Sequence, residues 1–433
     1  MKKVVSLFLS LMLVFSMLGV SGCGSSKKNE NDSKSSGPVT VNFWHVYSEN
    51  FGAPVLKEAI AAFNAQHKDI VVKDTYNPNM YPGLMQNLQA EVASGSSPSI
   101  VMIGYNYVKY FASNFQYVEP SAIISKIPED KNYLSDNFLN NVLSLAQVDG
   151  KQIGLPYAIS TPMLYINADL FKAAGLDPNN PPTTMEEVRE AAKTISKKTG
   201  KYGFYMQEYS DNWAVQGLLE SNGASIMTNG KASFATQEAV DAYKLLSDMV
   251  LVDKSALHIT ADEGIQSFIN GKVGMLYGTS AKIGTIQKGA QFKLTATSAP
   301  GFKGKEVKIP AGGNFLSIMA KTEAEQKASW EFIKFLMQPE WLAKWSKNTG
   351  YLPPRKGVAE DPNGLKSYIE SNPLMGINFK QMANVKSWVA FPNDVGVKAE
   401  QIFANTRDKI LGGTDTPDKA LKSAQDQINE LLK

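Results

Sequence analysis

The sequence predicts an α/β protein with two regions, each a sheet covered by helices. Segments with the alternation of β-strands are followed by amphipathic helical segments, an order typical of a parallel sheet with helices on its faces. About 400 residues follow the first 38, which is more than one hydrophobic core usually holds. The composition, 43% hydrophobic and 20% charged, is that of a well-packed soluble protein, so we expect two lobes.

The N-terminus has the pattern of a lipoprotein signal peptide. Lys2 and Lys3 precede an apolar run at residues 4–20, which is shorter than the roughly 20 residues that cross a bilayer comfortably. Small residues follow, and then Cys23, the only cysteine of the chain. We therefore expect residues 1–22 to be removed and Cys23 to carry a lipid at the outer face of a bacterial cell membrane. The alternative is an ordinary signal peptide with an incidental cysteine.

Residues 23–38 form the next segment, and almost none of them is apolar. Such a segment cannot offset the entropy lost on ordering, so we expect a flexible tether. Removal of residues 1–22 takes away two of the lysines behind the formal net charge of +3, which leaves +1. This nearly neutral charge argues against nucleic acid or an acidic lipid surface as the main partner.

The first region opens with a strand at residues 39–45, because Val39, Val41 and Phe43 alternate with polar residues. A helix follows with Pro54 in its first turn. A strand at 70–72, a helix at 81–94 and a strand at 99–103 complete this region. Ligands of such sheets bind beyond the carboxyl ends of the strands, so the loops there are candidate site positions.

The second region begins with a strand at 163–166. Thr184 and Glu187 form a capping box that opens a helix, and Gly200 ends it. Thr236 can cap another helix, which reaches about Val252. Further strands are expected at 273–277 and at 312–318.

The C-terminal part of the chain is expected to be helical. One helix at 330–337 is stopped by Pro339. A final amphipathic helix carries its apolar face on Leu421, Ala424, Ile428, Leu431 and Leu432.

Catalytic and metal-binding motifs are sparse in the sequence. The three histidines, His45, His67 and His258, are far apart in sequence and belong to no metal-binding motif. Neighbouring carboxylates such as Asp262-Glu263 stand at expected helix starts, where acidic side chains favour the helix dipole. We therefore expect no catalytic residue, no metal and no cofactor.

Aromatic residues recur at the expected strand ends and in loops. Flat rings with polar tips can stack on the C–H face of a sugar while polar groups bind its hydroxyls. Any one of these rings is also compatible with a place in the core, so only their recurrence favours a sugar site. The residues are Trp44, Tyr47, Tyr76, Tyr81, Tyr105, Tyr107, Trp213, Tyr277, Tyr351 and Trp388.

Several segments of the sequence together form a recognisable pattern. They are Phe43-Trp44-His45, Ser-Thr-Pro-Met-Leu-Tyr-Ile-Asn at 160–167, the segments 170–178, 181–184 and 271–274, Gly312-Gly313-Asn314 and Thr-Gly-Tyr-Leu-Pro at 349–353. With these segments the sequence resembles the extracellular solute-binding proteins of ABC importers, family 1, sugar-binding type. The resemblance runs in matching order from about Val39 to the C-terminus, and it is closest to the branch that includes glycerol-3-phosphate binders.

The resemblance implies a two-lobed, type II periplasmic-binding-protein-like fold with hinge crossovers near 156–162, 277–280 and 320–325. The N-terminal lobe would comprise 39–155 and 278–320, and the C-terminal lobe 156–277 and 321–433. It further implies a monomer that closes around a small-molecule carbohydrate and passes it to the permease subunits of an ABC importer, with no enzymatic step.

The resemblance also implies a ligand site. Tyr81, Ser160, Trp213 and Tyr351 match binding positions of the glycerol-phosphate branch, with one position near Thr279 or Ser280 and another at Gly312 or Gly313. The candidate set is completed by Trp44, Tyr105, Asn314 and Asp394.

Two departures from the family pattern bear on the ligand. Tyr105 stands where the branch has an acidic residue, and the arginine that takes the phosphate falls near Val395, beside Asp394. A missing charge-assisted partner is worth about 1.5–3 kcal/mol. The departures favour a neutral sugar or oligosaccharide, with Asp394 accepting hydroxyls or simply forming a turn. Glycerol-3-phosphate or a glycerophosphodiester is the alternative ligand.

Two other classes of protein compete with this interpretation. A secreted carbohydrate-active enzyme would need two carboxylates roughly 5 to 9.5 Å apart across a cleft, and no motif points to such a pair. A surface adhesion lipoprotein would favour repeats or all-β modules, and the sequence shows no repeat of 20 to 50 residues.

Overall fold

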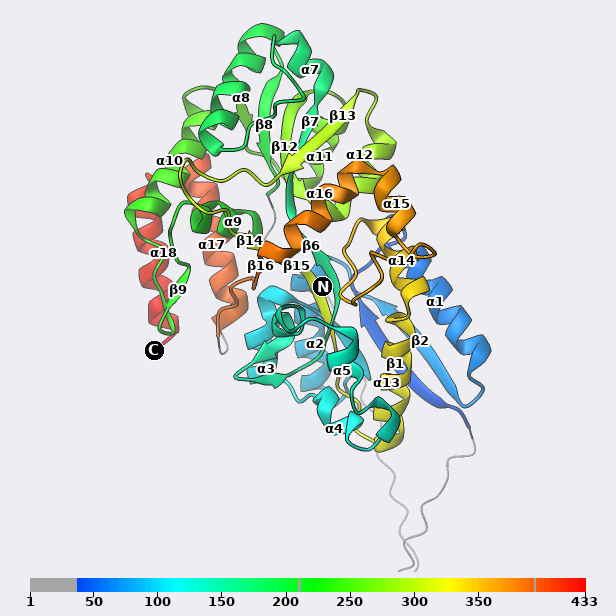
Figure 1. The fold of residues 1–433 in the computed structure, drawn as a ribbon. Coiled ribbons are helices and arrows are strands. Elements are labelled where there is room, and N and C mark those ends of the chain that lie inside the picture. Colours follow the sequence, from blue (N-terminus) through cyan, green and yellow to red (C-terminus); the bar gives the residue numbers. More distant parts are fainter. Residues whose placement is uncertain (1–36, 209–211, 393–394) are drawn as a thin grey trace, which may run out of the picture. The chain divides into compact units, whose positions relative to one another are not determined.

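The computed structural model describes residues 37–208, 212–392 and 395–433. The signal peptide expected at 1–22, Cys23, the tether except Gly37 and Pro38, and Asp394 lie outside the described residues. Residues from Pro38 onward form one unit, whose helices and strands are shown in Figure 1.

The first sheet has five strands with β3 in the middle. Its order is β2 (Ile70–Tyr76), β1 (Val39–His45), β3 (Ile100–Gly104), β15 (Gly312–Ile318) and β6 (Leu155–Ser160). β1 runs parallel to β2 and β3, whereas β15 is antiparallel to β3 and β6. Val41 and Phe43 are fully buried, which confirms the alternation at 39–45. The sheet is mixed rather than parallel, because β15 enters it from late in the chain.

Helices pack around the first sheet, as the sequence order indicates. α1 contacts β2 and α14, α2 contacts β3, and α13 contacts β1 and β15; their bounds are α1 (Ala53–Gln66), α2 (Met80–Ala93), α13 (Glu323–Leu336) and α14 (Pro339–Thr349). Shorter elements follow β3 in the chain, namely α3 (Val108–Asn114), α4 (Pro120–Ile124), α5 (Tyr133–Asn137), α6 (Asn140–Leu143) and the pair β4 (Gln147–Val148) and β5 (Lys151–Gln152).

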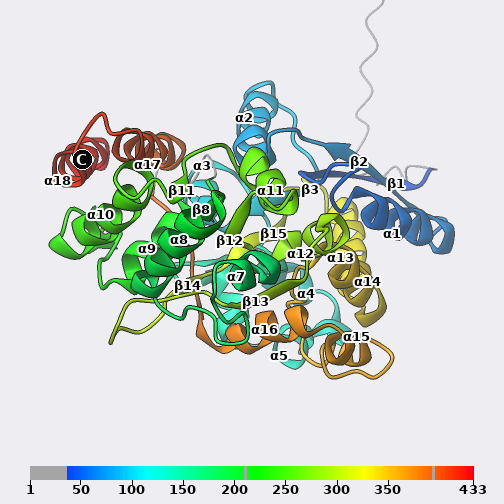
Figure 2. The same ribbon diagram turned by 90° about the horizontal axis from the view of Figure 1, so that it is seen from above.

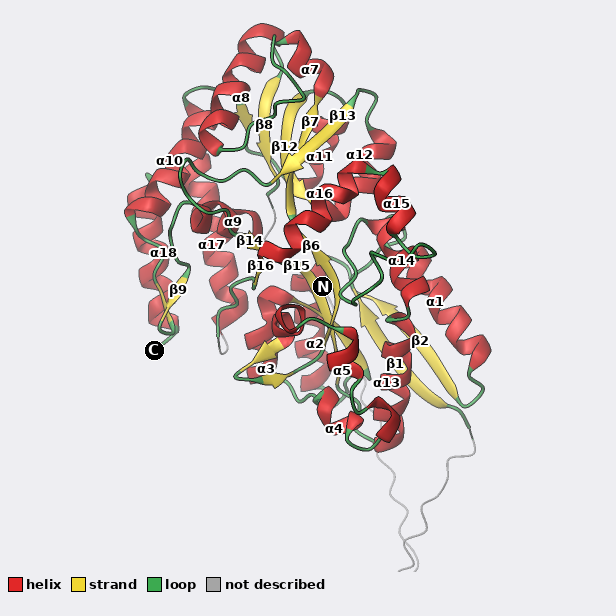
Figure 3. Cartoon of the chain, viewed as in Figure 1, coloured by secondary structure: helices red, strands yellow, loops and turns green. Residues whose placement is uncertain are grey.

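The second sheet also has five strands, in the order β11 (Ala256–Leu257), β8 (Tyr202–Met206), β12 (Val273–Thr279), β7 (Pro162–Asn167) and β13 (Leu294–Ser298). β8 is parallel to β11 and β12, and β7 is antiparallel to β12 and β13. Figure 3 shows the strands of both sheets in yellow with helices in red around them. The helices of this part are α7 (Ala168–Ala173), α8 (Met185–Thr199), α9 (Trp213–Ser221), α11 (Ala261–Ile269), α12 (Ile283–Gly289), α15 (Lys366–Ser371) and α16 (Pro373–Gln381).

Three long helices contact one another near the C-terminus: α10 (Gln237–Leu251), α17 (Gly396–Leu411) and α18 (Pro417–Leu431). Figures 1 and 2 both show α17 beside α18. Leu421, Ala424 and Ile428 of α18 are buried, which confirms that part of its expected apolar face. Short strand pairs complete the fold, β9 (Met227–Thr228) with β10 (Lys231–Ala232) and β14 (Ile309–Pro310) with β16 (Val385–Lys386).

The expectation for the helix at 330–337 is wrong in its bounds. This helix begins at Glu323, where the side chain of Thr322 accepts a hydrogen bond from the Glu325 amide. Pro339 does not stop it but opens α14. The reason is that proline is well tolerated in the first turn of a helix, where its missing N–H would have no intrahelical partner.

The packing also differs from the expected lobe boundaries at two segments. β13 lies within 278–320, which we expected in the N-terminal lobe, but it pairs with β7 in the second sheet. α13 and α14 lie within 321–433, but they contact β1 and α1 at the first sheet. The chain passes from the first sheet to the second at Thr161, between β6 and β7, as expected for 156–162. It returns between β13 and β15 rather than at 277–280.

No helix among the described residues combines the length and the apolar character that a bilayer crossing requires.

Candidate ligand-binding site

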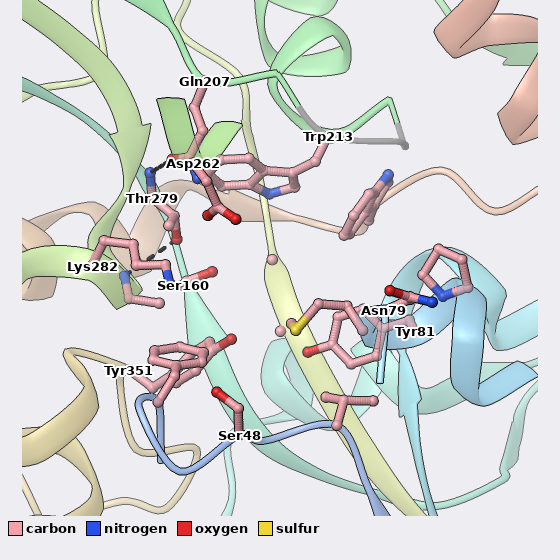
Figure 4. Close-up of a pocket in the computed structure, with 18 of the residues that line it drawn as sticks. Ser48, Asn79, Tyr81, Ser160, Gln207, Trp213, Asp262, Thr279, Lys282 and Tyr351 are labelled. Atoms are coloured by element: carbon pink, nitrogen blue, oxygen red, sulfur yellow. Dashed lines mark hydrogen bonds between the residues drawn. The ribbon is translucent and has the colours of Figure 1, made fainter. Parts of the chain in front are cut away.

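A cavity of about 520 Å³ is lined by residues from both sheets and from the loops that follow their strands. Its size is typical of a small-molecule site. We call it the aromatic cavity, and Figure 4 shows most of the residues that line it: Val46, Ser48, Phe51, Tyr76, Asn79, Met80, Tyr81, Pro82, Ser160, Gln207, Trp213, Asp262, Thr279, Ala281, Lys282, Gly312, Gly313, Tyr351 and Trp388.

Tyr81 reaches the aromatic cavity from the first turn of α2. The two residues before it, Asn79 and Met80, have positive φ angles of 63° and 54°. For residues other than glycine this conformation is uncommon, and strained backbone conformations are most frequent at functional sites. A β-carbon at Gly104 would lie 2.7 Å from the Tyr81 ring. Glycine at the end of β3 therefore lets the ring lie against the strand.

Asn314 fixes the Tyr81 hydroxyl from β15. Its amide nitrogen donates hydrogen bonds to Tyr47 Oη at 2.6 Å and to Tyr81 Oη at 2.9 Å. Burial raises the pKa of both tyrosines well above the usual value. Both phenols are thus neutral at physiological pH and can serve as hydrogen-bond donors and acceptors.

The Gly312-Gly313 pair gives the cavity its shape beside Trp213. A β-carbon at Gly312 would lie 2.5 Å from Ser160 Oγ and 2.9 Å from Trp213 Nε1. Gly313 has a φ of +113°, and its β-carbon would lie 2.0 Å from the Ala158 carbonyl oxygen. Only glycine fits at either position, so the indole and Ser160 can approach the strand closely.

Two tryptophans are held in place by hydrogen bonds from their indole nitrogens. Trp213, the first residue of α9, donates to the Pro310 carbonyl at 3.1 Å. Trp388 donates to Asn212 Oδ1 at 2.5 Å. With the nitrogens bound to the protein, the ring surfaces are what these residues present to the cavity.

Tyr351 follows the C-terminus of α14, where Gly350 adopts a φ of +80°. Its ring lies nearly parallel to that of Trp345, with centroids 6.0 Å apart and an interplanar angle of 8°. A β-carbon at Gly350 would lie 2.4 Å from the Ser280 carbonyl oxygen. The Thr-Gly-Tyr sequence thus places a tyrosine against the segment that follows β12.

That segment is fixed by buried polar contacts. The Thr279 amide donates to Gln207 Oε1 at 2.9 Å. Ser280 exchanges hydrogen bonds with Thr161, because its amide donates to the Thr161 carbonyl at 2.9 Å and its Oγ accepts from the Thr161 amide at 3.1 Å. These bonds tie the end of β12 to the residue that joins β6 and β7.

Comparison with known proteins identifies the family. A family model described as bacterial extracellular solute-binding protein matches residues 58–375. The chain belongs to this family. Because these are extracellular proteins, the protein acts outside the cytoplasm.

The relatives include the sn-glycerol-3-phosphate-binding periplasmic protein UgpB of Escherichia coli K12, 26% identical over 91% of this chain and 93% of the relative. UgpB of Pectobacterium atrosepticum is 27% identical over 91% of both chains.

Solved structures of other proteins share the fold. UgpB from Mycobacterium tuberculosis in complex with glycerophosphocholine superimposes with a TM-score of 0.79 at 21% identity, over 92% of this chain and 98% of that one. The cyclic alpha-maltosyl-1,6-maltose binding protein from Arthrobacter globiformis gives a TM-score of 0.75 at 24% identity, over 92% of this chain and 100% of that one. This solute-binding protein therefore has the expected type II periplasmic-binding-protein fold.

The structure brings seven of the residues nominated from the sequence to one cavity: Tyr81, Ser160, Trp213, Thr279, Gly312, Gly313 and Tyr351. Whether they bind ligand stays a prediction. Asp394 lies outside the described residues.

Four other nominated residues do not line the cavity of this solute-binding protein. Trp44 is half-buried within β1, and Tyr105 is buried beside Phe315. Ser280 and Asn314 are fully buried, where they bond to protein groups. Direct roles of these four residues in ligand binding stay predictions.

The cavity also contains residues that the sequence did not nominate as ligand-binding, among them Gln207, Asp262, Lys282 and Trp388. Trp388 is part of the aromatic recurrence, so its residue type was a usable signal. Asp262 was interpreted only as a helix-start residue, and it does lie in the first turn of α11. Lys282 belongs to no motif; it lies in the turn directly after β12, and its ammonium is 4.3 Å from the centroid of the Phe51 ring.

A separate ionic cluster lies around Glu208, directly after Gln207 in the chain. His258 Nδ1 is 2.7 Å from Glu208 Oε2. Arg407 Nε lies 3.5 Å from the same oxygen, and Arg407 also pairs with Asp408 at 2.8 Å. The hydrogen bond to Glu208 raises the pKa of His258, although burial opposes this. These contacts form an ion-pair network of Glu208, His258, Arg407 and Asp408.

Proposed function

We propose that this solute-binding protein captures a carbohydrate in the aromatic cavity and delivers it unchanged to an ABC importer. The observation that carries the proposal is the lining of the cavity. The rings of Tyr81, Trp213 and Tyr351 face a space that also contains the hydroxyl groups of Ser160 and Thr279. Such a lining suits a sugar, whose C–H faces stack on rings while its hydroxyls take hydrogen bonds.

Named relatives support a sugar or a glycerol phosphate as the ligand class. The similar structures include a binding protein for cyclic maltosyl-maltose and a maltose-bound MalE3. Other relatives are named for sn-glycerol-3-phosphate. We favour a sugar or oligosaccharide, and a glycerol-3-phosphate or glycerophosphodiester ligand is the second candidate because of these names.

Delivery to a permease requires that the loaded protein differ from the empty one. A ligand that touches residues of both sheets can hold them together. If it binds the closed form about 10⁴-fold better than the open form, it moves the population from mostly open to mostly closed. Cys23 would hold the protein at the membrane through a lipid, and residues 23–38 would give it reach.

The proposal is tested by thermal unfolding of the mature chain with a panel of sugars, oligosaccharides and glycerol phosphates. A ligand at 100 times its dissociation constant should add about 2.7 kcal/mol to the free energy of unfolding. Stabilisation by a saccharide supports the main proposal. Stabilisation by glycerol phosphates alone supports the second candidate. Turnover of a glycoside in the same samples would overturn both and favour an enzyme.

A further inference from the structure

Lys282 brings a positive charge into the aromatic cavity without an anionic partner. It is the last residue of the 3-10 turn η4 (Ser280–Lys282), and it lines the cavity on the same wall as Asp262 and Thr279 (Figure 4). Its ammonium nitrogen lies 4.3 Å from the centroid of the Phe51 ring. Among the described residues, no hydrogen bond or ion pair to this nitrogen is found.

Other partly buried lysines of the protein do have partners. Lys334 Nζ lies 2.7 Å from Asp130 Oδ2, and Lys308 is paired with Glu306. A charge that leaves water is costly unless a paired or hydrogen-bonded group compensates it. Burial lowers the pKa of Lys282, in keeping with an ammonium that has no hydrogen-bonded partner. An aromatic ring compensates an ammonium only in part.

Asp262 is the one other charged residue that lines the cavity among the described residues. It is exposed, and it stands in the first turn of α11, where a carboxylate favours the helix dipole. It forms no ion pair with Lys282, since the two groups are not within 4.0 Å. The negative charge of Asp262 opposes the effect of burial on the pKa of Lys282, but without direct contact it leaves the hydrogen-bonding positions of the ammonium available to a ligand.

We propose that Lys282 is an anion-binding residue of the aromatic cavity, and that the natural ligand is a sugar or glycerol compound carrying a phosphate or carboxylate group. This inference rests on the proposed function and narrows its substrate class. The sequence has no arginine near Val395, where the glycerol-phosphate branch has one, whereas Lys282 supplies a cation from a different part of the chain. A lysine ammonium binds phosphate or carboxylate oxygens as a point charge.

The test is calorimetric titration of the mature chain with matched neutral and anionic compounds. The pairs are glucose with glucose-1-phosphate and with glucuronic acid, maltose with maltose-1-phosphate, and glycerol with glycerol-3-phosphate; glycerophosphocholine is added as a diester. We expect the anionic member of at least one pair to bind more tightly, and the pair identifies whether the anion is a phosphate or a carboxylate.

Variants of Lys282 and of nearby residues test whether this lysine causes the tighter binding of anionic compounds. Lys282→Met should weaken binding of the anionic compound by about 10- to 100-fold, the loss expected for one charge-assisted hydrogen bond, and Lys282→Arg should retain most of it. Asp262→Asn should strengthen anion binding, because it removes a nearby negative charge. The control is Lys288→Met on α12, which removes an exposed lysine that does not line the cavity. The unliganded Lys282→Met protein should melt no lower than the wild type, because the contact with the Phe51 ring compensates burial of the charge only in part.

The outcomes separate the inference from the proposed function. Neutral compounds that bind as tightly as anionic ones, with no effect of Lys282→Met, would overturn the anion site and leave carbohydrate capture standing. Equal weakening by Lys282→Met and Lys288→Met would also overturn it, since the effect would then be one of net charge. Failure of every compound, neutral and anionic, would count against both.

Discussion

At the residue scale, Gly313 is the position where the cavity depends most strictly on backbone conformation. Gly313→Ala should destabilise the protein by about 2–4 kcal/mol, because alanine disfavours a φ of +113° and its β-carbon would lie 2.0 Å from the Ala158 carbonyl. Gly376→Ala is the matched control. That glycine lies in α16 with no atom within 4 Å of an added β-carbon, so alanine should be neutral or stabilising. Urea denaturation measures both, and equal stabilities would contradict the argument.

Truncation of the aromatic side chains that line the cavity should weaken ligand binding. Trp213→Ala and Tyr351→Ala should each weaken ligand binding about tenfold, since a stacking ring is worth about 1.5 kcal/mol. Both rings are 4% exposed or less, so alanine also removes packing. Trp341→Ala separates the two effects, because Trp341 packs on Phe335 outside the cavity. This variant should lose stability but keep the wild-type affinity in calorimetric titrations; a similar loss of affinity would refute the placement of the site.

The family resemblance predicted some of the residues that line the cavity. Tyr81, Ser160 and Trp213 could be nominated because the family resemblance matches them position by position, and they do line the cavity. Asn314 was nominated from the same pattern, but it acts on Tyr47 and Tyr81 instead of facing the cavity. A single sequence does not show which way a strand residue points at a register shift, and β15 has one between Asn314 and Phe315.

At the element scale, the docking of α13 depends on a buried carboxylate from another part of the chain. Asp130 Oδ2 accepts from Trp330 Nε1 at 2.8 Å and from Lys334 Nζ at 2.7 Å. Asp130→Ala should cost about 2–4 kcal/mol, because it leaves a buried indole N–H and a partly buried ammonium without this acceptor. Glu323→Ala on the same helix breaks only exposed pairs, with Lys126 and Lys327, and should cost less than about 1 kcal/mol. Urea denaturation would contradict this account if both variants lost the same stability.

Helix ends were predicted correctly where neighbouring residues determine them. Predictions failed where contacts between distant parts of the chain determine the structure. The capping box of Thr184 and Glu187 is present, and Gly200 ends that helix in the left-handed conformation, because a cap needs only neighbours in sequence. Pro339 was assigned as a stop although it opens α14, since proline fits either role. The place of β13 in the second sheet could not be predicted, because strand partners are set by contacts distant in sequence.

At the scale of the whole molecule, two histidines affect the free energy of unfolding with opposite pH dependences. The pKa of His258 is raised by its hydrogen bond to Glu208, so its contribution is present below the usual pKa of about 6.5 and is lost as pH rises through the folded-state pKa. The pKa of His45 is lowered by burial, against the effect of Asp74, so stability is instead lost as pH falls below about 6.5.

Paired variants measure this difference by urea denaturation at pH 5.5 and pH 8.5. The stability advantage of the wild type over His258→Gln should be larger at the lower pH. Its advantage over His45→Asn should be larger at the higher pH. The same pH trend in both variants would show that the two histidines are not titrating in the environments described.

The crystal structure of the mature chain with the saccharide that stabilises it most, neutral or anionic, is the most direct test of ligand capture in the aromatic cavity. We expect the intact saccharide in that cavity, with a sugar face against Trp213 and hydroxyls near Ser160 and Thr279. A saccharide bound elsewhere on the protein, or one found cleaved in the cavity, would contradict the assignment of this chain as a carbohydrate-capturing solute-binding protein.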